Sequence, residues 1–357
     1  MGRRYLLHLP LALGLGAGAL LLAHEPEPSR YDYRKDVLPI VKKHCGSCHY
    51  PGGIAPMSLL QYQQTVPWAQ SMKLKVLEGV MPPWLPEEEV GEFRGARSLS
   101  AEEIEILVDW ASGGTPEGGP VSEEPQAAGP GEGWGIGTPD LILEPSQDEV
   151  VGADEAEKTS CVVLPTGLDE TRWVSALAFQ PGNPSMVHDV RIAVADTCEP
   201  KQRPLATWLP GDGAMALPDG VAERLPAGAS LALSIHYRKT WLDDGKVLKD
   251  RSRVGLYFVT GGEPVRAVRI EGSEYRFLEE VRLLSVFPDP VSPEPIEMAA
   301  LTSDGEKVPL LRIDAFDPAW RAKYVFRRPL SLPAGTVLTV TPPAVWVDYL
   351  PATENGK

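Results

Sequence analysis

The chain has 357 residues, of which 43% are hydrophobic, so it is long and apolar enough for two or three domains. Its formal net charge of −15 at pH 7 argues against a nucleic-acid partner, because phosphate binding requires clustered Lys and Arg. The acidic balance is typical of a solvated surface, and it also suits contact with cationic redox partners.

The first 24 residues have the pattern of a secretory signal. Arg3 and Arg4 precede an apolar run over residues 9–23 that is short for a membrane span. Leu21 stands where a small residue is preferred before a cleavage point, so an uncleaved N-terminal anchor is the alternative. We expect an exported protein, in the periplasm or on the outer surface of a bacterium, with no further membrane-spanning segment.

Residues 30–118 are predicted to form one small helical domain. Three helices are expected: one that Asp36 caps, with Pro39 in its first turn; one over residues 67–78; and one that starts at the capping box of Ser100 and Glu103. The third helix should end at Gly113-Gly114.

The sequence Cys45-Gly46-Ser47-Cys48-His49 has the spacing C-x-x-C-H, which is typical of covalent haem attachment. Two thiols add to the two haem vinyl groups, and the adjacent histidine is placed to bind the iron. A zinc site would need further ligands nearby, but the only other cysteines are Cys161 and Cys198. A thioredoxin-like pair would start a helix in a βαβ unit, which is a different context. We therefore expect one haem c.

A haem-bearing helix, a loop and a final amphipathic helix resemble a class I cytochrome c domain. Met81-Pro82, ahead of the last helix, looks like the distal ligand loop of that family. The resemblance implies an all-α domain with His49 and Met81 as axial iron ligands. Met57 is the alternative sixth ligand, an open or His-ligated position is a further alternative, and packing in the helical core explains Met72.

Other residues near the motif have less specific roles. His44 is expected at the surface or beside a haem propionate. Tyr62, Trp68 and Trp84 are expected to line the haem pocket or simply to fill the core around it.

Residues 119–133 are rich in Pro, Gly and Glu and are predicted to be a linker. Beyond them, short β-type runs are separated by Gly- and Pro-containing turns, which favours β-sandwiches. We expect two sandwiches, over residues 134–262 and 263–357. The clearest strands are predicted at Trp173–Phe179, Val187–Ala195, Ser230–Tyr237 and Val254–Val259.

Several phrases in residues 134–345 resemble the copper type II, ascorbate-dependent monooxygenases, the group of the peptidylglycine-hydroxylating and dopamine β-monooxygenases. The resemblance implies a tandem pair of jelly-roll-like β-sandwiches. The phrases are Val162–Gly167, Met186–Asp189, Leu231–Tyr237 and Leu332–Thr336.

The copper ligands of that family are mostly missing here. By position, His188 and His236 match two ligands of one copper, and Asp189 stands where a third histidine is expected. No histidine follows His236, so the second copper site has none. The resemblance therefore implies the fold without the oxygenase chemistry, and copper is not expected.

His188, Asp189 and His236 have an alternative interpretation as a two-His, one-carboxylate metal site. Adjacent residues of a regular strand point to opposite faces, so an irregular strand would be required. Otherwise the two histidines are core residues with satisfied hydrogen bonds.

Cys161 and Cys198 are predicted to form a disulfide, because exported chains usually pair such cysteines. Two free buried thiols are the alternative.

Together these features predict an exported monohaem cytochrome that transfers single electrons with redox partner proteins of the periplasm or cell surface. The β region would act as a scaffold or partner-binding module. A copper-dependent monooxygenase fed by the haem, and a non-redox binding module with a structural haem, are the two alternatives.

Overall fold

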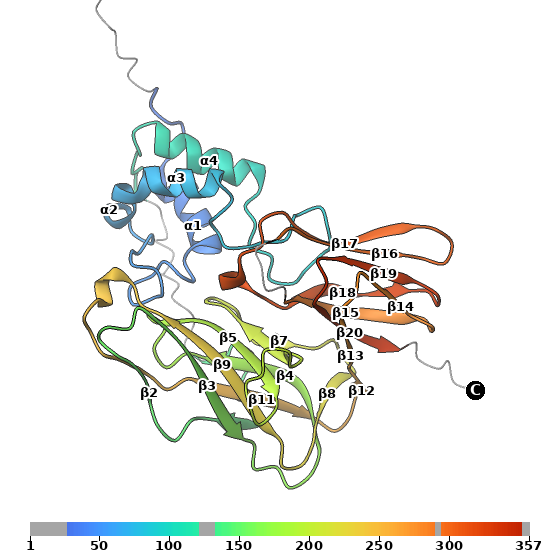
Figure 1. The fold of residues 1–357 in the computed structure, drawn as a ribbon. Helices are drawn as coiled ribbons and strands as arrows, with labels where there is room; N and C mark the ends of the chain where they lie inside the picture. The colour runs from blue at the N-terminus through green and yellow to red at the C-terminus, as the bar shows by residue number, and fades with distance from the viewer. Residues whose placement is uncertain (1–26, 121–132, 290–293, 352–357) are drawn as a thin grey trace, which may run out of the picture.

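A computed structural model describes residues 27–120, 133–289 and 294–351. The predicted signal or anchor and most of the predicted linker lie outside the described residues. The fold is mostly β-sheet with few helices, as expected. Figure 1 shows a group of helices beside two groups of strands. In the described part of the chain, no helix is long and apolar enough to cross a membrane.

The helical unit gathers the helices between residues 33 and 112 around one hydrophobic core. Val37, Val41, Leu107 and Trp110 are fully buried in it, and Met72 is buried there too, as core packing predicts. Its elements are η1 (Tyr33–Val37), α1 (Leu38–His44), α2 (Tyr62–Thr65), η2 (Val66–Trp68), α3 (Ala69–Leu77) and α4 (Ala101–Ser112).

The helix caps are predicted correctly in one case and wrongly in another. Ser100 and Glu103 form the predicted capping box at α4. At η1, however, the cap is Asp32, whose side chain accepts from the Lys35 backbone N–H at 2.8 Å. Asp36 instead accepts from the Asp32 backbone N–H at 2.9 Å. The prediction of Asp36 is wrong because the chain turns helical four residues earlier than the apolar pattern indicates.

The first β unit contains two sheets that share one core. One sheet has the order β1-β11-β4-β8-β12, with β7 on β4, and the other has the order β3-β9-β5-β6. A small sheet, β10-β2, lies beside them. The strands are β1 (Leu141–Leu143), β2 (Glu149–Val151), β3 (Glu157–Pro165), β4 (Arg172–Gln180), β5 (Val187–Val194), β6 (Ala206–Trp208), β7 (Met215–Ala216), β8 (Val221–Leu225), β9 (Ser230–Arg238), β10 (Leu248–Asp250), β11 (Arg253–Val259) and β12 (Glu263–Pro264), with a short helix η3 (Trp241–Asp243).

The second β unit has the same kind of construction from a separate core. Its sheets have the orders β13-β20-β15-β18 and β14-β19-β16-β17. Its elements are β13 (Arg266–Ile270), β14 (Glu274–Arg276), β15 (Val281–Pro288), β16 (Ile296–Leu301), β17 (Lys307–Ile313), η4 (Pro318–Trp320), β18 (Tyr324–Leu332), β19 (Val337–Thr341) and β20 (Val345–Pro351).

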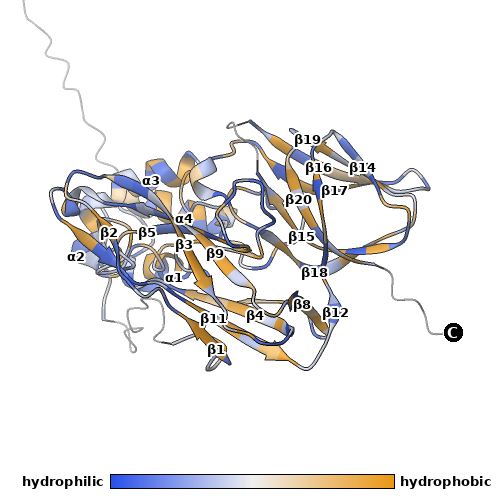
Figure 2. Ribbon diagram, turned by 60° about the horizontal axis from the view of Figure 1, so that its bottom comes forward, coloured by the Kyte–Doolittle hydropathy of each residue, from blue (hydrophilic) through white to orange (hydrophobic). Residues whose placement is uncertain are grey.

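Alternating side chains explain why these segments are strands. In β3, Val162 and Leu164 are buried while Cys161 and Val163 are exposed, because successive side chains point to opposite faces. Figure 2 shows hydrophobic and hydrophilic positions mixed along the strands of both β units. All four of the most clearly predicted strands are present, as β4, β5, β9 and β11.

The segment between α3 and α4, residues 79–99, leaves the helical unit and packs on the second β unit (Figure 1). Phe93 is 3% exposed in that unit's core and forms an isolated bridge with Phe326. Trp84 packs edge-on against Tyr324, with ring centroids 5.6 Å apart. The expectation that Trp84 lines the pocket or core of the helical domain is therefore wrong, because Trp84 packs against an aromatic ring of β18 instead.

A buried ionic cluster joins the two β units. The Asp348 carboxylate accepts from Arg203 Nε at 2.8 Å and pairs with Lys323 Nζ at 2.5 Å. Lys323 also donates to the carbonyl oxygens of Pro204 and Leu205. Burial alone would raise the pKa of Asp348, but the two cations outweigh it and hold that pKa below its usual range. A buried charge is costly unless it is paired, so these ion pairs hold the two β units together.

The predicted disulfide between Cys161 and Cys198 is confirmed. It ties β3 to the chain that follows β5, and it closes a loop with a sequence separation of 37 residues.

We predict that replacing both cysteines, Cys161→Ser with Cys198→Ser, lowers the free energy of unfolding by about 4 kcal/mol, because the unfolded chain regains the entropy of this loop. Urea unfolding of the variant and of the oxidised wild type measures the difference. Equal midpoints and slopes, or labelling of both thiols in oxidised unfolded wild type, would contradict the prediction.

Candidate haem site and histidine cluster

The C-x-x-C-H motif forms a tight turn directly after α1. The backbone N–H groups of Cys48 and His49 both donate to the Cys45 carbonyl oxygen, at 3.1 and 2.9 Å. The helical end and this turn bring the three functional side chains together in a half-buried position. Cys45 and Cys48 are not bonded to each other or to the remaining cysteines.

His49 is oriented by one hydrogen bond from its ring. Its Nδ1 lies 3.2 Å from the Met57 carbonyl oxygen, and since a carbonyl only accepts, Nδ1 carries the proton. The other nitrogen, Nε2, is then the unprotonated one. Burial lowers the pKa of His49, which favours the neutral ring that a metal ligand requires.

The two motif thiols are held in their protonated form. Burial raises the pKa of Cys45 to about 12, and the neighbouring Cys48 adds to the effect. Burial also raises the pKa of Cys48. A disulfide-exchange pair needs a lowered thiol pKa, so these environments do not fit that chemistry. The donor set of two unpaired thiols and an oriented imidazole fits covalent haem.

His44 is buried, and the expectation of a surface position is wrong. Its Nδ1 lies 3.1 Å from the Arg97 carbonyl oxygen, and its Nε2 lies 3.0 Å from a Glu103 carboxylate oxygen. Both ring nitrogens are therefore used within the chain. No sequence pattern indicates these contacts, because Arg97 and Glu103 are more than fifty residues away.

His188, Asp189 and His236 meet on neighbouring strands of the first β unit. Asp189 Oδ2 lies 3.0 Å from His188 Nδ1 and 2.8 Å from His236 Nδ1. The register of β5 against β9 shifts between Val187 and Asp189. This irregularity is the feature that convergence of two adjacent residues requires.

Asp189 is hydrogen-bonded to both histidines, and these bonds shift the pKa of Asp189 and of His236. Burial alone would raise the pKa of Asp189, but hydrogen bonds from both imidazoles outweigh it and lower that pKa. The hydrogen bond to Asp189 raises the pKa of His236. Trp320, from η4 of the second β unit, covers His188 with ring centroids 4.6 Å apart. His188 itself is only 3% exposed.

The cluster also has the donor types of a two-His, one-carboxylate metal site. One ligand atom from each residue can be chosen so that all lie within 4.8 Å of one another. An ion bound through both Nδ1 atoms would have to displace the hydrogen bonds to Asp189. Among the described residues no other such group is found, and the stretch Leu284–Asp289, where the second copper would be expected, lies in and just after β15.

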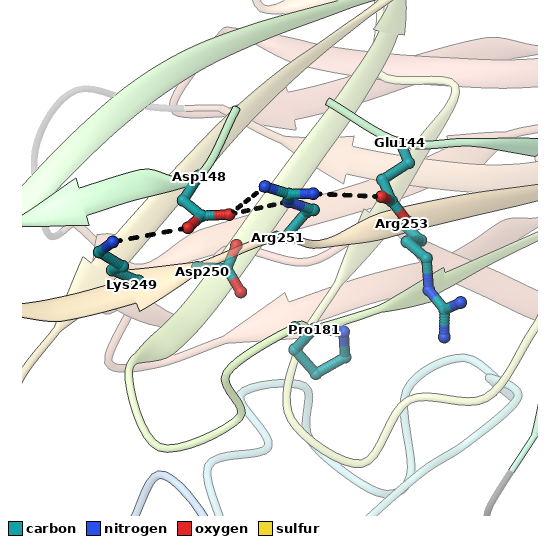
Figure 3. A pocket seen from close by; sticks show the side chains of 8 residues that line it. Glu144, Asp148, Pro181, Lys249, Asp250, Arg251 and Arg253 are labelled. Atoms are coloured by element: carbon teal, nitrogen blue, oxygen red, sulfur yellow. Dashed lines mark hydrogen bonds and ion pairs between the residues drawn. The ribbon is translucent and has the colours of Figure 1, made fainter. Parts of the chain in front are cut away.

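A separate hollow of about 460 Å³ on the first β unit is lined mainly by charged side chains. Figure 3 shows Asp148 between Lys249 and Arg251, with Glu144 on the far side of Arg251. These charges pair with one another, and several are substantially exposed, so they contribute little free energy and point to no ligand. We attach no function to this hollow.

No family model matches the chain, and no curated protein matches it. The geometry of the motif and of the cluster therefore carries the functional argument.

We predict a pH-dependent contribution of the cluster to stability. The pKa of Asp189 is depressed, so its contribution is present above its ordinary value of 3.8 and is lost as the pH falls through the folded value. The pKa of His236 is raised, so its contribution is full below 6.5 and is lost as the pH rises through the folded value.

The difference in unfolding free energy between wild type and Asp189→Asn should therefore be largest between pH 3.8 and pH 6.5. Denaturant titrations at a series of pH values measure it. Asp196→Asn, at an exposed position nearby in the chain, is the control. A difference that stays constant from acid to alkaline pH would show that the two groups are not linked as described.

Proposed function

We propose that the protein is an exported monohaem c-type cytochrome that transfers single electrons. The helical unit would be a class I cytochrome c domain, and the two β units would be jelly-roll-like sandwiches of the copper-monooxygenase type that serve as a scaffold. The observation that carries the proposal is the motif itself: two unpaired thiols beside a histidine whose Nδ1 is anchored to the Met57 carbonyl oxygen.

In this proposal Cys45 and Cys48 would hold the haem through thioether bonds, and His49 Nε2 would bind its iron. The haem supplies a one-electron couple when bound. The Met57 carbonyl fixes the orientation of the imidazole and increases its basicity, as partners of metal-bound histidines commonly do. Before the haem is attached, the raised pKa values keep the two thiols uncharged, which makes disulfide exchange slow.

The position of Met57 favours Met81 as the sixth ligand. The Met57 carbonyl oxygen contacts His49 Nδ1, which is on the side of the ring away from Nε2. The Met57 backbone is thus engaged on the Nδ1 side of the imidazole, and Met81 would supply the thioether that binds the iron. Met81 follows α3 in a different segment and is half-buried.

The acidic chain suits electron exchange with cationic partner proteins in the periplasm or at the cell surface. A copper-dependent monooxygenase remains the second candidate because His188, Asp189 and His236 converge. A two-copper oxygenase would need a second set of imidazole or thioether ligands, and the chain has no histidine after His236. A haem with a purely structural role would not exchange electrons with partner proteins at all.

We predict one covalent haem per chain and iron as the only bound transition metal. Matured protein should keep its haem through acid–acetone extraction, and elemental analysis should give one iron and no copper. Cys45→Ala with Cys48→Ala should abolish covalent haem, whereas Cys161→Ser with Cys198→Ser should leave it, because that pair lies in the first β unit. Extractable haem would refute the proposal, and two tightly bound coppers would support the oxygenase instead.

We predict His/Met ligation through Met81. The oxidised protein should show the weak sulfur-to-iron band at the red edge of the near-infrared. Met81→Ala should remove that band and lower the reduction potential, because a thioether ligand raises it. Met57→Ala is the matched control and should keep the band. Loss of the band in Met57→Ala alone would transfer the role to Met57.

A further inference from the structure

We infer that the first β unit forms part of the haem site. Residues 209–213, the cover loop between β6 and β7, lie against the Cys48 side of the attachment motif. This inference rests on the proposed covalent haem and adds a second domain to its environment.

Two residues of the motif contact the cover loop. Cys48 Sγ lies 3.6 Å from the Pro210 carbonyl oxygen. Gly211, with φ of 90°, approaches Ser47 so closely that a Cβ added at Gly211 would overlap the Ser47 side chain. A glycine is therefore required at this position for two reasons, its backbone conformation and the contact.

The cover loop is held in one conformation by its own hydrogen bonds. Asp212 Oδ2 accepts from the Leu209 backbone N–H at 2.8 Å, and Trp208 Nε1 donates to the Asp212 carbonyl oxygen at 3.2 Å. Arg97 adds two contacts from outside the loop: Nη1 donates to the Pro210 carbonyl oxygen at 2.8 Å, and Nη2 pairs with Asp212 at 2.5 Å.

Arg97 also connects the loop to the haem-bearing helix. Its backbone carbonyl oxygen lies 3.1 Å from Nδ1 of His44, the residue that precedes Cys45. The Arg97 side chain is 14% exposed and that of Asp212 is 37% exposed, so the ion pair is partly shielded from water. The cover loop, Arg97 and the end of α1 thus surround the motif as one continuous set of contacts.

A thioether at Cys48 would attach the haem to the sulfur that the Pro210 carbonyl oxygen contacts, and so next to the cover loop. A cavity of about 490 Å³ borders the same place and is lined by Ser47 and Tyr50 from the helical unit and by Phe179 and Trp208 from the first β unit. The Cys48 side of the motif therefore faces the first β unit.

The cover loop should influence the reduction potential of the haem. Solvent exposure and nearby dipoles are two of the quantities that set this potential. Water at the haem edge stabilises the ferric form, which carries one more positive charge than the ferrous form. Moving the cover loop away from Cys48 should therefore lower the potential without removing the covalent bonds.

The test uses the full-length matured protein and a pair of variants with matched controls. Gly211→Ala forces the cover loop away from Ser47. Gly220→Ala is its control, because Gly220 also has a positive φ, of 78°, but an added Cβ meets nothing within 4 Å. Arg97→Ala removes the two loop contacts. Arg94→Ala is its control, because Arg94 donates to the Ala216 carbonyl oxygen at 2.9 Å, beyond the cover loop.

Spectroelectrochemical titration should give a lower potential in Gly211→Ala and in Arg97→Ala, with haem content and far-ultraviolet circular dichroism unchanged. Both controls should keep the wild-type potential. An unchanged potential in the two test variants, or an equal fall in the controls, would overturn the inference while the cytochrome proposal stands. Wild-type protein without covalent haem would overturn both.

Discussion

The arrangement of the three units depends on the segment between α3 and α4. This stretch of chain contacts both β units. Phe93 is buried in the core of the second β unit, and the Arg94 and Arg97 side chains donate to carbonyl oxygens of the first. Burial of one phenylalanine contributes about 2–3 kcal/mol. The segment starts where α3 ends, shortly before Met81, and finishes at the cap of α4. Its two ends therefore attach to two helices of the helical unit.

The ionic cluster at Asp348 fixes the two β units to each other. The two β units could position a common segment only if they were fixed to each other. Asp348 belongs to the second β unit, and its partner Arg203 belongs to the first. Each of these two charges has a further partner, Glu223 for Arg203 and Lys323 for Asp348, so the ion pair is one link in a buried network that spans both units. The contact between the cover loop and Cys48 is thus a consequence of packing across all three units.

The sequence predicted those features that local chemistry determines. The Ser100–Glu103 capping box, the alternating strands and the pairing of Cys161 with Cys198 are present where expected. Features that depend on distant contacts are not predicted. The sequence pattern places Trp84 and His44 in the wrong surroundings and indicates neither Arg97 nor the cover loop. Their partners lie far away in sequence, and no periodicity or motif marks such contacts before the chain is folded.

The histidine cluster is stabilised by hydrogen bonds between its own members. A buried carboxylate is costly unless its oxygens accept hydrogen bonds, and Asp189 accepts from both His188 and His236. Trp320 covers the first imidazole and thereby links the cluster to the second β unit. An ion bound through the two Nδ1 atoms would have to displace these hydrogen bonds. Our proposal places the redox chemistry at the motif after α1, where two unpaired thiols accompany His49.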